Sequence, residues 1–416
     1  MIEAMRALIP ALLLGLSGPL AAQQALSAQE SAPQGAPSIE PAPAPPAPPA
    51  PLPPAPLNWT EAAARETLAE VLAAAREGLN PADYAPAALE AALASGDQAA
   101  IATAAEASWM ALARDYAAGR TPIEARIGWK SPPPRSDPAW LRAKLAEGLG
   151  AGTPGEALRA LLPTHPHYRA LQAALPATTD PDTLNRLRAN MDRWRWMPRQ
   201  LGERHLFANV AGNTVDLVDG GVPVARHKII VGARKTPTPQ FSAVATAITI
   251  NPPWVLPKSI VAESVGSLIR RSPSVARARG YRWTETADGL QVVQMPGNRN
   301  SLGTLKIEMP NPYAIFFHDT PAKHLFNGQD LALSHGCMRT QGILGLALRL
   351  LEDLPEWDAA RIDATAATNI TTRIDLPQQV PVHVGYFTMV PAKGGTVQTY
   401  VDVYGRDEAV VAALSR

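Results

Sequence analysis

Cysteine, charge and aromatic side chains are all scarce in this sequence. Among 416 residues there is one cysteine, Cys337, while charged residues make up 18% and aromatic residues 6%. A single cysteine excludes a disulfide within the chain, and a lone thiol in an oxidising compartment is kept only where it is buried or used. The formal net charge of +1 excludes an overall electrostatic attraction to nucleic acid or to an anionic membrane. Any recognition by charge must therefore be local.

Long apolar runs are also missing. The stretch at residues 7–16 follows Arg6 and precedes the small residues Ala21 and Ala22, and it is too short to cross a bilayer as a helix. This arrangement is typical of a secretory signal. We expect residues 1–22 to be a signal peptide, either cleaved or kept as an anchor, with no other transmembrane segment and a mature protein in the periplasm.

Proline, by contrast, is abundant, with 42 residues in the chain. Between residues 32 and 57 it nearly alternates with alanine, a composition that cannot bury a core and favours extended polyproline geometry. We interpret residues 23–57 as a semi-rigid linker that holds the folded part away from the membrane. A proline-rich motif for a partner protein is the alternative.

Helical spacing of apolar residues begins after the linker. Thr60 is a suitable N-cap, Gly78 lies near the expected end, and one face collects Leu68, Val71, Leu72, Ala75 and Leu79. A second helical face, whose aromatic rings we expect in the core, collects Ile101, Ala105, Ser108, Trp109, Leu112 and Tyr116. Residues 58–190 are therefore predicted to be an α-helical scaffold domain.

After Trp194 the hydrophobic period changes to two. Short β-rich runs alternate with Gly-containing turns, as at residues 205–210 and 214–218. Many short strands with such turns indicate a β-sandwich or barrel. The predicted fold class is α+β: the helical domain is followed by a mostly β, sandwich-like catalytic domain at residues 191–395 and a C-terminal strand and helix at 396–416.

Residues 252–303 do not fit the strand pattern. The segment has helical spacing at residues 260–271, and long insertions in β domains are usually functional, often as a lid. Five arginines of this segment form either a binding surface for an acidic substrate or a solvated basic face. They are Arg270, Arg271, Arg277, Arg279 and Arg282.

The chemistry is concentrated in residues 334–339, Ser-His-Gly-Cys-Met-Arg. A cysteine nucleophile needs a base or a positive field for its thiolate and hydrogen-bond donors for the oxyanion of a tetrahedral intermediate. Gly336 allows the backbone to approach closely. The amides of Cys337 and Met338 are candidate oxyanion donors, and Arg339 can hold anionic charge nearby.

Two histidines are candidate bases for the thiol. His335 lies two residues before Cys337, so that on an extended segment both side chains share a face. His318 ends an expected strand, where a structural role is the alternative. A helix expected to begin near Thr340 would add a favourable field at its N-terminus. A zinc site built from these histidines, His324 and Cys337 is a further alternative, although the spacing matches no common zinc motif.

These residues resemble the YkuD-type L,D-transpeptidases. The similarity rests on Ser-His-Gly-Cys-Met-Arg at 334–339 and on His-Asp-Thr-Pro at 318–321. Further blocks in the same order are similar to the YcbB-like branch of that family, at residues 191–198, 251–254, 300–303, 402–407 and, more weakly, 78–84. The separate peptidoglycan-binding domain of that branch is missing, and Phe316 stands where relatives often have tyrosine.

The resemblance implies roles for the site residues. Cys337 is the expected nucleophile and His318 the base that shuttles its proton, while His335, Gly336 and Arg339 shape the site. No metal or other cofactor is implied. The candidate substrate-binding residues are Ser334, Met338, Trp254 and the five arginines at positions 270, 271, 277, 279 and 282.

The resemblance also implies the reaction. The family attacks the carbonyl on the L-centre of meso-diaminopimelate in one stem peptide, expels D-Ala, and passes the thioester to the amine of another stem. The implied product is a diaminopimelate-to-diaminopimelate cross-link in peptidoglycan, with carbapenems as inhibitors. A donor carbonyl at L-Ala, hydrolysis by a carboxypeptidase, and a wall-binding protein without catalysis are the alternatives.

Overall fold

The computed structural model describes residues 56–415. The expected signal peptide at residues 1–22 and nearly all of the expected linker at 23–57 lie outside the described residues. Within residues 56–415, no helix is both long enough and apolar enough to cross a membrane.

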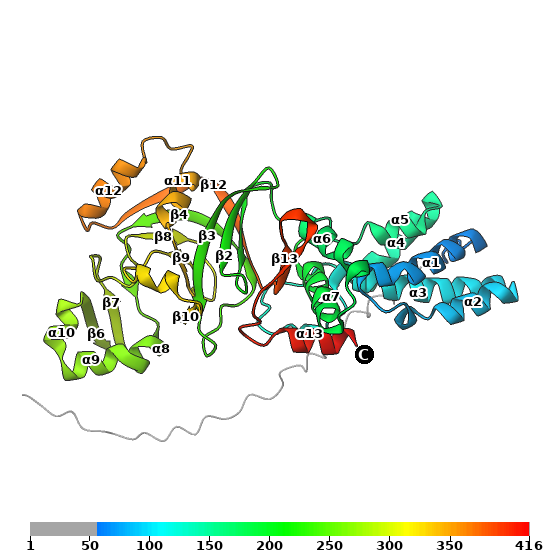
Figure 1. Cartoon of the computed structure of the whole chain (residues 1–416), viewed down its shortest axis with the longest axis horizontal. Helices are drawn as coiled ribbons and strands as arrows, with labels where there is room; N and C mark the ends of the chain where they lie inside the picture. Colours follow the sequence, from blue (N-terminus) through cyan, green and yellow to red (C-terminus); the bar gives the residue numbers. More distant parts are fainter. Residues whose placement is uncertain (1–55, 416) are drawn as a thin grey trace, which may run out of the picture. The chain divides into compact units, whose positions relative to one another are not determined.

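The described chain begins with a series of α-helices (Figure 1). α1 (Glu61–Ala73) starts after Thr60, whose hydroxyl accepts a hydrogen bond from the Ala63 amide, and the 3-10 turn that follows ends at Gly78 with a φ of 75°. Both predicted helix signals are therefore confirmed. The helices that follow are α2 (Pro86–Ser95), α3 (Gln98–Ala118), α4 (Pro138–Ala151), α5 (Pro154–Arg159), α6 (Pro166–Ala174) and α7 (Pro181–Trp196).

Aromatic residues of these helices lie in their core, among alanine and leucine side chains. Trp109 and Tyr116 of α3, predicted as core residues, are 0% and 1% exposed. The same apolar cluster includes Phe207 and Phe387, on which Trp194 of α7 stacks with ring centroids 5.6 and 4.6 Å apart. The helices therefore share a core with the β-rich region that follows.

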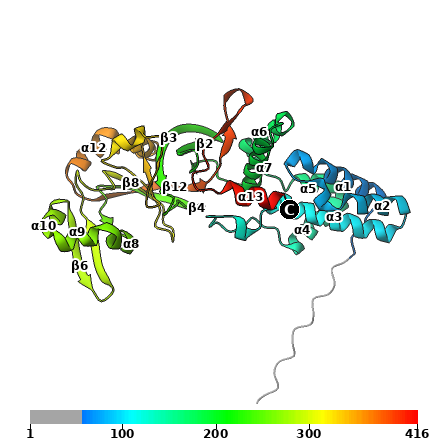
Figure 2. The same cartoon turned by 60° about the horizontal axis from the view of Figure 1, so that its bottom comes forward.

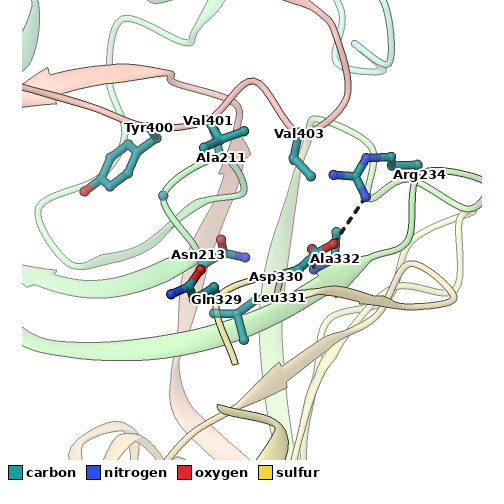
Figure 3. Close-up of a pocket in the computed structure, with 11 residues that line it drawn as sticks. Ala211, Asn213, Arg234, Gln329, Asp330, Leu331, Ala332, Tyr400, Val401 and Val403 are labelled. Atoms are coloured by element: carbon teal, nitrogen blue, oxygen red, sulfur yellow. Dashed lines mark hydrogen bonds and ion pairs between the residues drawn. The ribbon is translucent and has the colours of Figure 1, made fainter. Parts of the chain in front are cut away.

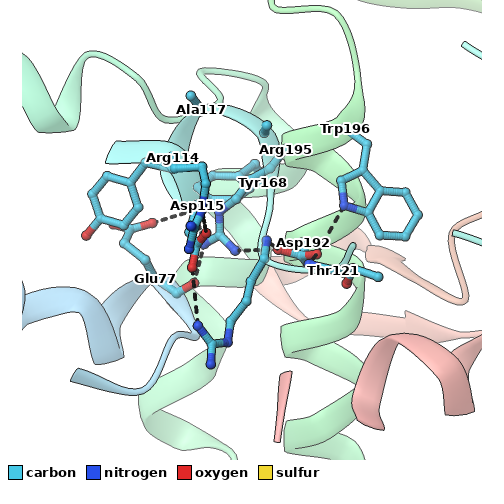
Figure 4. A network of polar contacts seen from close by, with 12 residues as sticks. Glu77, Arg114, Asp115, Ala117, Thr121, Tyr168, Asp192, Arg195 and Trp196 are labelled. Atoms are coloured by element: carbon cyan, nitrogen blue, oxygen red, sulfur yellow. Dashed lines mark hydrogen bonds and ion pairs between the residues drawn. The ribbon is translucent and has the colours of Figure 1, made fainter. Parts of the chain in front are cut away.

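α7 carries the Arg-Trp-Arg-Trp segment into this core. The fully buried guanidinium of Arg195 contacts Asp192 at 3.3 Å and the Tyr168 hydroxyl at 2.8 Å (Figure 4). Asp192 also accepts hydrogen bonds from the Arg120 amide at 2.9 Å and from the Trp196 indole at 3.0 Å. The predicted domain boundary at residue 190 falls inside this continuous helix, which ends at Trp196.

The β-rich region is one sheet of nine strands. They are β1 (His205–Asn209), β2 (Thr214–Asp219), β3 (Val222–Gly232), β4 (Phe241–Ile250), β8 (Leu305–Glu308), β9 (Phe317–His318), β10 (Ala332–Ser334), β11 (Met338–Thr340) and β12 (Thr372–Gly385). The strand order is β10-β3-β11-β9-β8-β4-β12-β1-β2, and β2 also pairs with β3, so the hydrogen bonding closes into a ring. The ring is the barrel form of the two expected β architectures, and the predicted α+β class is confirmed.

α11 (Ile343–Leu350) packs on the apolar core of this ring, and α12 (Ala359–Ala367) follows it. Gly342, with a φ of 62°, precedes α11. The helix predicted to begin near Thr340 begins at Ile343 instead, because residues 338–340 form β11, which pairs with β3 and β9. The N-terminus of this helix is therefore not next to Cys337 in the chain, as the expected electrostatic field of the helix required.

Residues 254–294, which we call the lid, form a small unit of helices and strands (Figure 2). The lid has an apolar cluster of its own. The strand order is β5-β7-β6. A π-helical turn at Val261–Val265 interrupts the helix between α8 and α9. The elements are β5 (Trp254–Val255), α8 (Lys258–Ile260), α9 (Gly266–Arg271), α10 (Pro273–Ala278), β6 (Tyr281–Thr286) and β7 (Gly289–Gln294).

The C-terminal segment returns to α7. It forms β13 (Met389–Pro391), β14 (Val397–Thr399) and α13 (Asp407–Leu414). Arg193 of α7 donates to the Asp407 carboxylate at 2.5 Å, and the Asn190 side chain accepts from the Thr388 amide at 2.9 Å. The sequence blocks at residues 191–198 and 402–407 therefore meet in space, although they are far apart in the chain.

Candidate active site

Cys337 lies in a tight turn between β10 and β11. In this nucleophile turn, residues 334–338, Ser334 Oγ donates to the Cys337 carbonyl at 2.6 Å and accepts from the Gly336 amide at 3.1 Å. Gly336 has a φ of 115°, and a Cβ there would lie 2.8 Å from Ile315 Cδ1, so the position requires glycine. Because the chain turns at Gly336, His335 and Cys337 do not share the face of an extended segment.

Two residues of this turn do not have the predicted substrate-binding role. Ser334 is 3% exposed, and its hydroxyl is used within the turn itself. Met338 is 0% exposed, and its amide donates to the Phe316 carbonyl at 3.0 Å, because the residue belongs to the β11 ladder. We therefore correct both predictions, and the Met338 amide is also excluded as an oxyanion donor.

The Cys337 sulfur faces a loop at residues 310–316. Its thiol donates to the Ala314 carbonyl at 3.4 Å, and Ala314 is held in the left-handed region with a φ of 54°. The side-chain amide of Asn311 fixes this loop by donating to the Met309 and Ile315 carbonyls at 2.5 and 2.7 Å. The strand expected to end at His318 is therefore only the two residues of β9, and the loop before it contacts the sulfur instead.

The resting cysteine is a neutral thiol. Burial raises the pKa of Cys337 to about 11, while the hydrogen bond from the Phe316 backbone and the charges of Lys306 and Arg339 act in the opposite direction. A nucleophile in this state needs a base to remove its proton at neutral pH.

His318 is the buried base candidate. It is 5% exposed, and its Nδ1 lies 2.5 Å from the Asp319 carbonyl oxygen. Burial and the neighbouring Arg339 charge lower the pKa of His318 to about 4, so the imidazole is neutral at neutral pH and able to accept a proton. In the part of the chain that the structure describes, no hydrogen bond joins His318 to Cys337.

The residue that follows His318, Asp319, is fixed by contacts with Thr304, Lys323 and the Asn-Ser-Leu-Gly block at residues 300–303. The Asp319 carboxylate accepts hydrogen bonds from the amide and hydroxyl of Thr304, both at 3.1 Å, and pairs with Lys323. It lies directly over Gly303, whose φ is 63° and where a Cβ would collide with the carboxylate. This packing explains why glycine ends the block.

A row of three cationic or titratable side chains crosses the sheet at His318. Strand register places Lys306 of β8 opposite His318, and His318 opposite Arg339 of β11, so the three side chains share a face. Lys306 Nζ lies 4.6 Å from the centre of the Phe316 ring and 3.5 Å from Glu308 Oε1. In residues 56–415, Arg339 has no ion-pair partner, and burial lowers its pKa. Arg339 is thus placed to attract a carboxylate.

Sequence reasoning missed Lys306. The alternation Leu-Lys-Ile-Glu at residues 305–308, with Leu305 and Ile307 buried, would have placed Lys306 on the polar face of a strand. Its position beside His318, however, depends on the register between two strands, which the sequence does not show.

His335 faces the lid rather than the thiol. Its Nε2 lies 2.9 Å from the carboxylate of Glu263 in the π-helical turn, and both side chains are partly exposed. Glu263 is a second residue that sequence reasoning missed. This contact joins the lid to the nucleophile turn next to Cys337.

The other predicted substrate-binding residues lie in the lid. Trp254 pairs with Gln294 and packs against the apolar cluster of the lid, which gives it a structural role. Arg277 lies 4.9 Å from the Trp283 ring centre. The five predicted arginines of the lid are Arg270, Arg271, Arg277, Arg279 and Arg282. All five are exposed, and in the described part of the chain none of them forms an ion pair.

A surface groove of about 370 Å³ is lined by residues that include Leu331 and Ala332 (Figure 3), but by none of the nucleophile turn. Arg234 and Asp330 form an ion pair of 3.2 Å at its wall, beside Asn213, Gln329 and Tyr400. Neither the nucleophile nor any other predicted catalytic residue lines this groove. It therefore lends no support to the predicted substrate-binding set.

Metal coordination has no geometric support in the described chain. Between residues 56 and 415, no three His, Cys, Asp or Glu side chains are grouped so that they could hold a metal ion. Of the four residues of the zinc alternative, His318 contacts a backbone carbonyl, His335 contacts Glu263, and the Cys337 thiol contacts the Ala314 carbonyl.

Comparison with known families assigns most of the described chain. Residues 203–356 match the YkuD family, an L,D-transpeptidase catalytic domain, and residues 56–175 match the Scaffold domain family. A Haemophilus influenzae protein described as a "Putative L,D-transpeptidase" is 24% identical over 259 residues, which cover 58% of this chain and 52% of that protein. The chain thus spans about half the length of this curated relative.

Two solved structures are also similar to this chain. An L,D-transpeptidase from Mycobacterium smegmatis has 13% identity and a TM-score of 0.25, covering 44% of this chain and 58% of that one. L,D-transpeptidase 1 of Mycobacterium tuberculosis has 12% identity and a TM-score of 0.22, covering 44% and 60%. These scores are too low to add to the assignment, which depends on the family models: the chain carries a YkuD-family L,D-transpeptidase catalytic domain at residues 203–356, preceded by a Scaffold domain.

Proposed function

We propose that this protein is a peptidoglycan L,D-transpeptidase that cross-links stem peptides through a thioester on Cys337. The observation that carries the proposal is the placement of the only cysteine. It lies within the YkuD domain, in a glycine-dependent turn, with a neutral buried histidine and an unpaired arginine on the adjoining strands. These are the parts that acyl transfer by a cysteine requires.

The first half of the reaction forms the acyl-enzyme. His318 takes the proton of the Cys337 thiol while the sulfur attacks the carbonyl on the L-centre of meso-diaminopimelate. The C–N bond to D-Ala then breaks, and His318 returns the proton to the leaving amine. In the second half, the side-chain amine of another stem attacks the thioester, His318 removes a proton from it, and the thiol is restored. One imidazole therefore serves both halves.

The two pKa values bear on the timing of this proton transfer. With the pKa of Cys337 raised to about 11 by burial and that of His318 lowered to about 4 by burial, a stable thiolate–imidazolium pair is disfavoured in the resting protein. We infer that the proton moves as the sulfur attacks, when negative charge passes on to the substrate oxygen. Strand register places two cations, Lys306 and Arg339, beside His318 at this step.

The products of the purified protein test this proposal. Incubation with stem tetrapeptides is expected to release D-Ala and form a dimer, in which tandem mass spectrometry locates a bond between two diaminopimelate residues. Release of D-Ala without a dimer would instead identify a carboxypeptidase. A dimer joined through L-Ala would keep the enzyme class but change the donor. Absence of both products would leave a wall-binding protein.

The exposed lid arginines are proposed to bind the carboxylates of a stem peptide. We expect Arg270→Gln with Arg271→Gln to raise KM about tenfold for each lost charge-assisted hydrogen bond of roughly 1.5 kcal/mol, with little change in kcat. Arg65→Gln on α1, an exposed arginine of the helical domain, is the matched control. Steady-state kinetics of cross-linking give both constants, and an unchanged KM would leave these arginines as a solvated surface.

The proposed place of action is the periplasm. The support is the sequence of residues 1–22, with a positive charge, an apolar stretch and small residues in that order. Peptidoglycan stems are then within reach of the folded part through the proline-rich segment.

A further inference from the structure

A buried hydroxyl lies beneath the nucleophile turn. Thr238 is 0% exposed, and its Oγ1 donates to the Gly336 carbonyl at 2.8 Å and accepts from the Gly232 amide at 2.9 Å. Thr238 is not part of the Ser-His-Gly-Cys-Met-Arg segment and lies 98 residues from Gly336 in the chain. No motif in the sequence indicates it.

Thr238 is fixed on every side. Its backbone amide donates to the Tyr404 hydroxyl at 3.2 Å, and its carbonyl accepts from Arg406 at 3.3 Å. The Arg406 guanidinium itself lies against the stacked rings of Tyr386 and Tyr404, 4.8 and 4.7 Å from their centres. At Gly232 a Cβ would collide with the backbone of residues 236–238. The hydroxyl that meets Gly336 therefore has little freedom to move.

The Gly336 carbonyl belongs to the peptide group that contains the Cys337 amide. A trans peptide is planar, with its C=O and N–H pointing in opposite directions. Because Thr238 holds the carbonyl beneath the turn, the Cys337 N–H points out on the other side. Among the residues that the structure describes, this amide has no hydrogen-bond acceptor, whereas the amides on either side donate to Ser334 and Phe316.

We propose that Thr238 is a positioning residue for acyl transfer, whose hydroxyl orients the Gly336–Cys337 peptide so that the Cys337 amide binds the oxyanion. This inference rests on the proposed function. When the sulfur bonds to the carbonyl carbon, the π electrons of the C=O bond move onto the oxygen. The Cys337 N–H then donates to that oxygen until the C–N bond breaks and the leaving amine takes its proton from His318.

The consequence is a specific loss of acyl transfer. Losing one oxyanion donor costs on the order of 10²–10³ in kcat, and a donor that is only misdirected costs less. Alkylation of the same sulfur by iodoacetamide displaces iodide from a saturated carbon and forms no oxyanion. The two reactions at Cys337 therefore separate an effect on the oxyanion from general damage to the turn.

The test compares acylation with alkylation in three variants. Thr238→Val has nearly the same shape but lacks the hydrogen bond, and Thr238→Ser restores the hydroxyl. Thr236→Val is the matched control, since Thr236 Oγ1 donates at 3.0 Å to the Ser334 carbonyl, which is in a different peptide of the same turn. Rates of acylation by a carbapenem and by stem tetrapeptide are measured beside the rate of alkylation and the melting temperature.

We expect Thr238→Val to slow acylation by about 10- to 100-fold at little change in KM and to change alkylation by less than about twofold. Thr238→Ser should recover most of the acylation rate, and Thr236→Val should leave the ratio of acylation to alkylation unchanged. The proposal would be overturned if Thr238→Val slowed acylation and alkylation by the same factor. It would also be overturned if Thr236→Val lowered the ratio of the acylation rate to the alkylation rate as much as Thr238→Val does.

The wild-type protein separates this inference from the proposed function. If it is acylated by the carbapenem but forms no dimer and releases no D-Ala, the proposed function fails while the comparison at Thr238 still gives its answer. If Cys337 is alkylated but never acylated by either compound, the role of Thr238 is refuted together with the function.

Discussion

Replacing Cys337 by alanine is expected to remove cross-linking and D-Ala release together, by at least about 10⁴-fold, because both products come from the same acyl-enzyme. No second cysteine is present to take over. The fold should survive, since the change deletes one sulfur at a partly accessible position, at a cost on the order of 1 kcal/mol. Product analysis by mass spectrometry and thermal unfolding of the variant check the two statements.

The same variant decides where a carbapenem binds. The wild-type protein is expected to gain the mass of one carbapenem on the peptide that contains Cys337, since the ring carbonyl is attacked as the stem carbonyl is. Cys337→Ala should gain none. An adduct on a serine, or cross-linking that persists in the folded variant, would contradict the assignment of the nucleophile.

The helices, the strands and the central residues of the site could be predicted from short stretches of the sequence. Trp109 and Tyr116 occur at helical spacing and lie in the helical core, and the period of two after Trp194 marks the strands. A lone cysteine that follows His-Gly and lies two residues before an arginine is chemically conspicuous wherever it occurs. Such signals span a few residues, so they survive without any knowledge of the tertiary fold.

Residues that act through strand register or through loop contacts could not be found in this way. Lys306 becomes a neighbour of His318 only because β8 and β9 pair in one register, and Thr238 meets Gly336 only because a distant loop packs beneath the turn. The same reason explains the errors at Ser334 and Met338. Being next to Cys337 in sequence suggested contact with the substrate, whereas turn and ladder hydrogen bonds bury both residues.

The hydrogen bonds around Thr238 connect α7 to the nucleophile turn. Arg193 of α7 donates to Asp407, and the residue before Asp407, Arg406, donates to the Thr238 carbonyl. The Asp-Val-Tyr-Gly-Arg-Asp block at residues 402–407 therefore lies between α7 and the nucleophile turn. Arg406 also fills the space over Gly128, where a Cβ would collide with its guanidinium. The blocks at residues 191–198 and 402–407 therefore both contribute side chains to the contacts that lead to the turn.

His318→Ala is expected to slow acylation at neutral pH by about 10²- to 10⁴-fold, the usual contribution of a general base. In the wild type, burial lowers the pKa of His318 to about 4, so its neutral form is present throughout the neutral range. The acylation rate should therefore be level from neutral pH down to about pH 5 and fall as the pH drops through about 4, where the imidazole becomes protonated.

In His318→Ala, the acylation rate should depend on pH in a different way and rise with pH above neutral. Without a base, attack requires the thiolate, and burial raises the pKa of Cys337 to about 11, so the acylation rate should climb about tenfold per pH unit from neutral pH toward that value. His335→Ala is the matched control, because His335 contacts Glu263 of the lid and its loss should leave the level wild-type profile in place. Carbapenem acylation rates measured between pH 4 and 10 distinguish the two histidines. If His318→Ala keeps a level profile at the wild-type rate, or if the rate in His335→Ala climbs tenfold per pH unit, His318 is not the base.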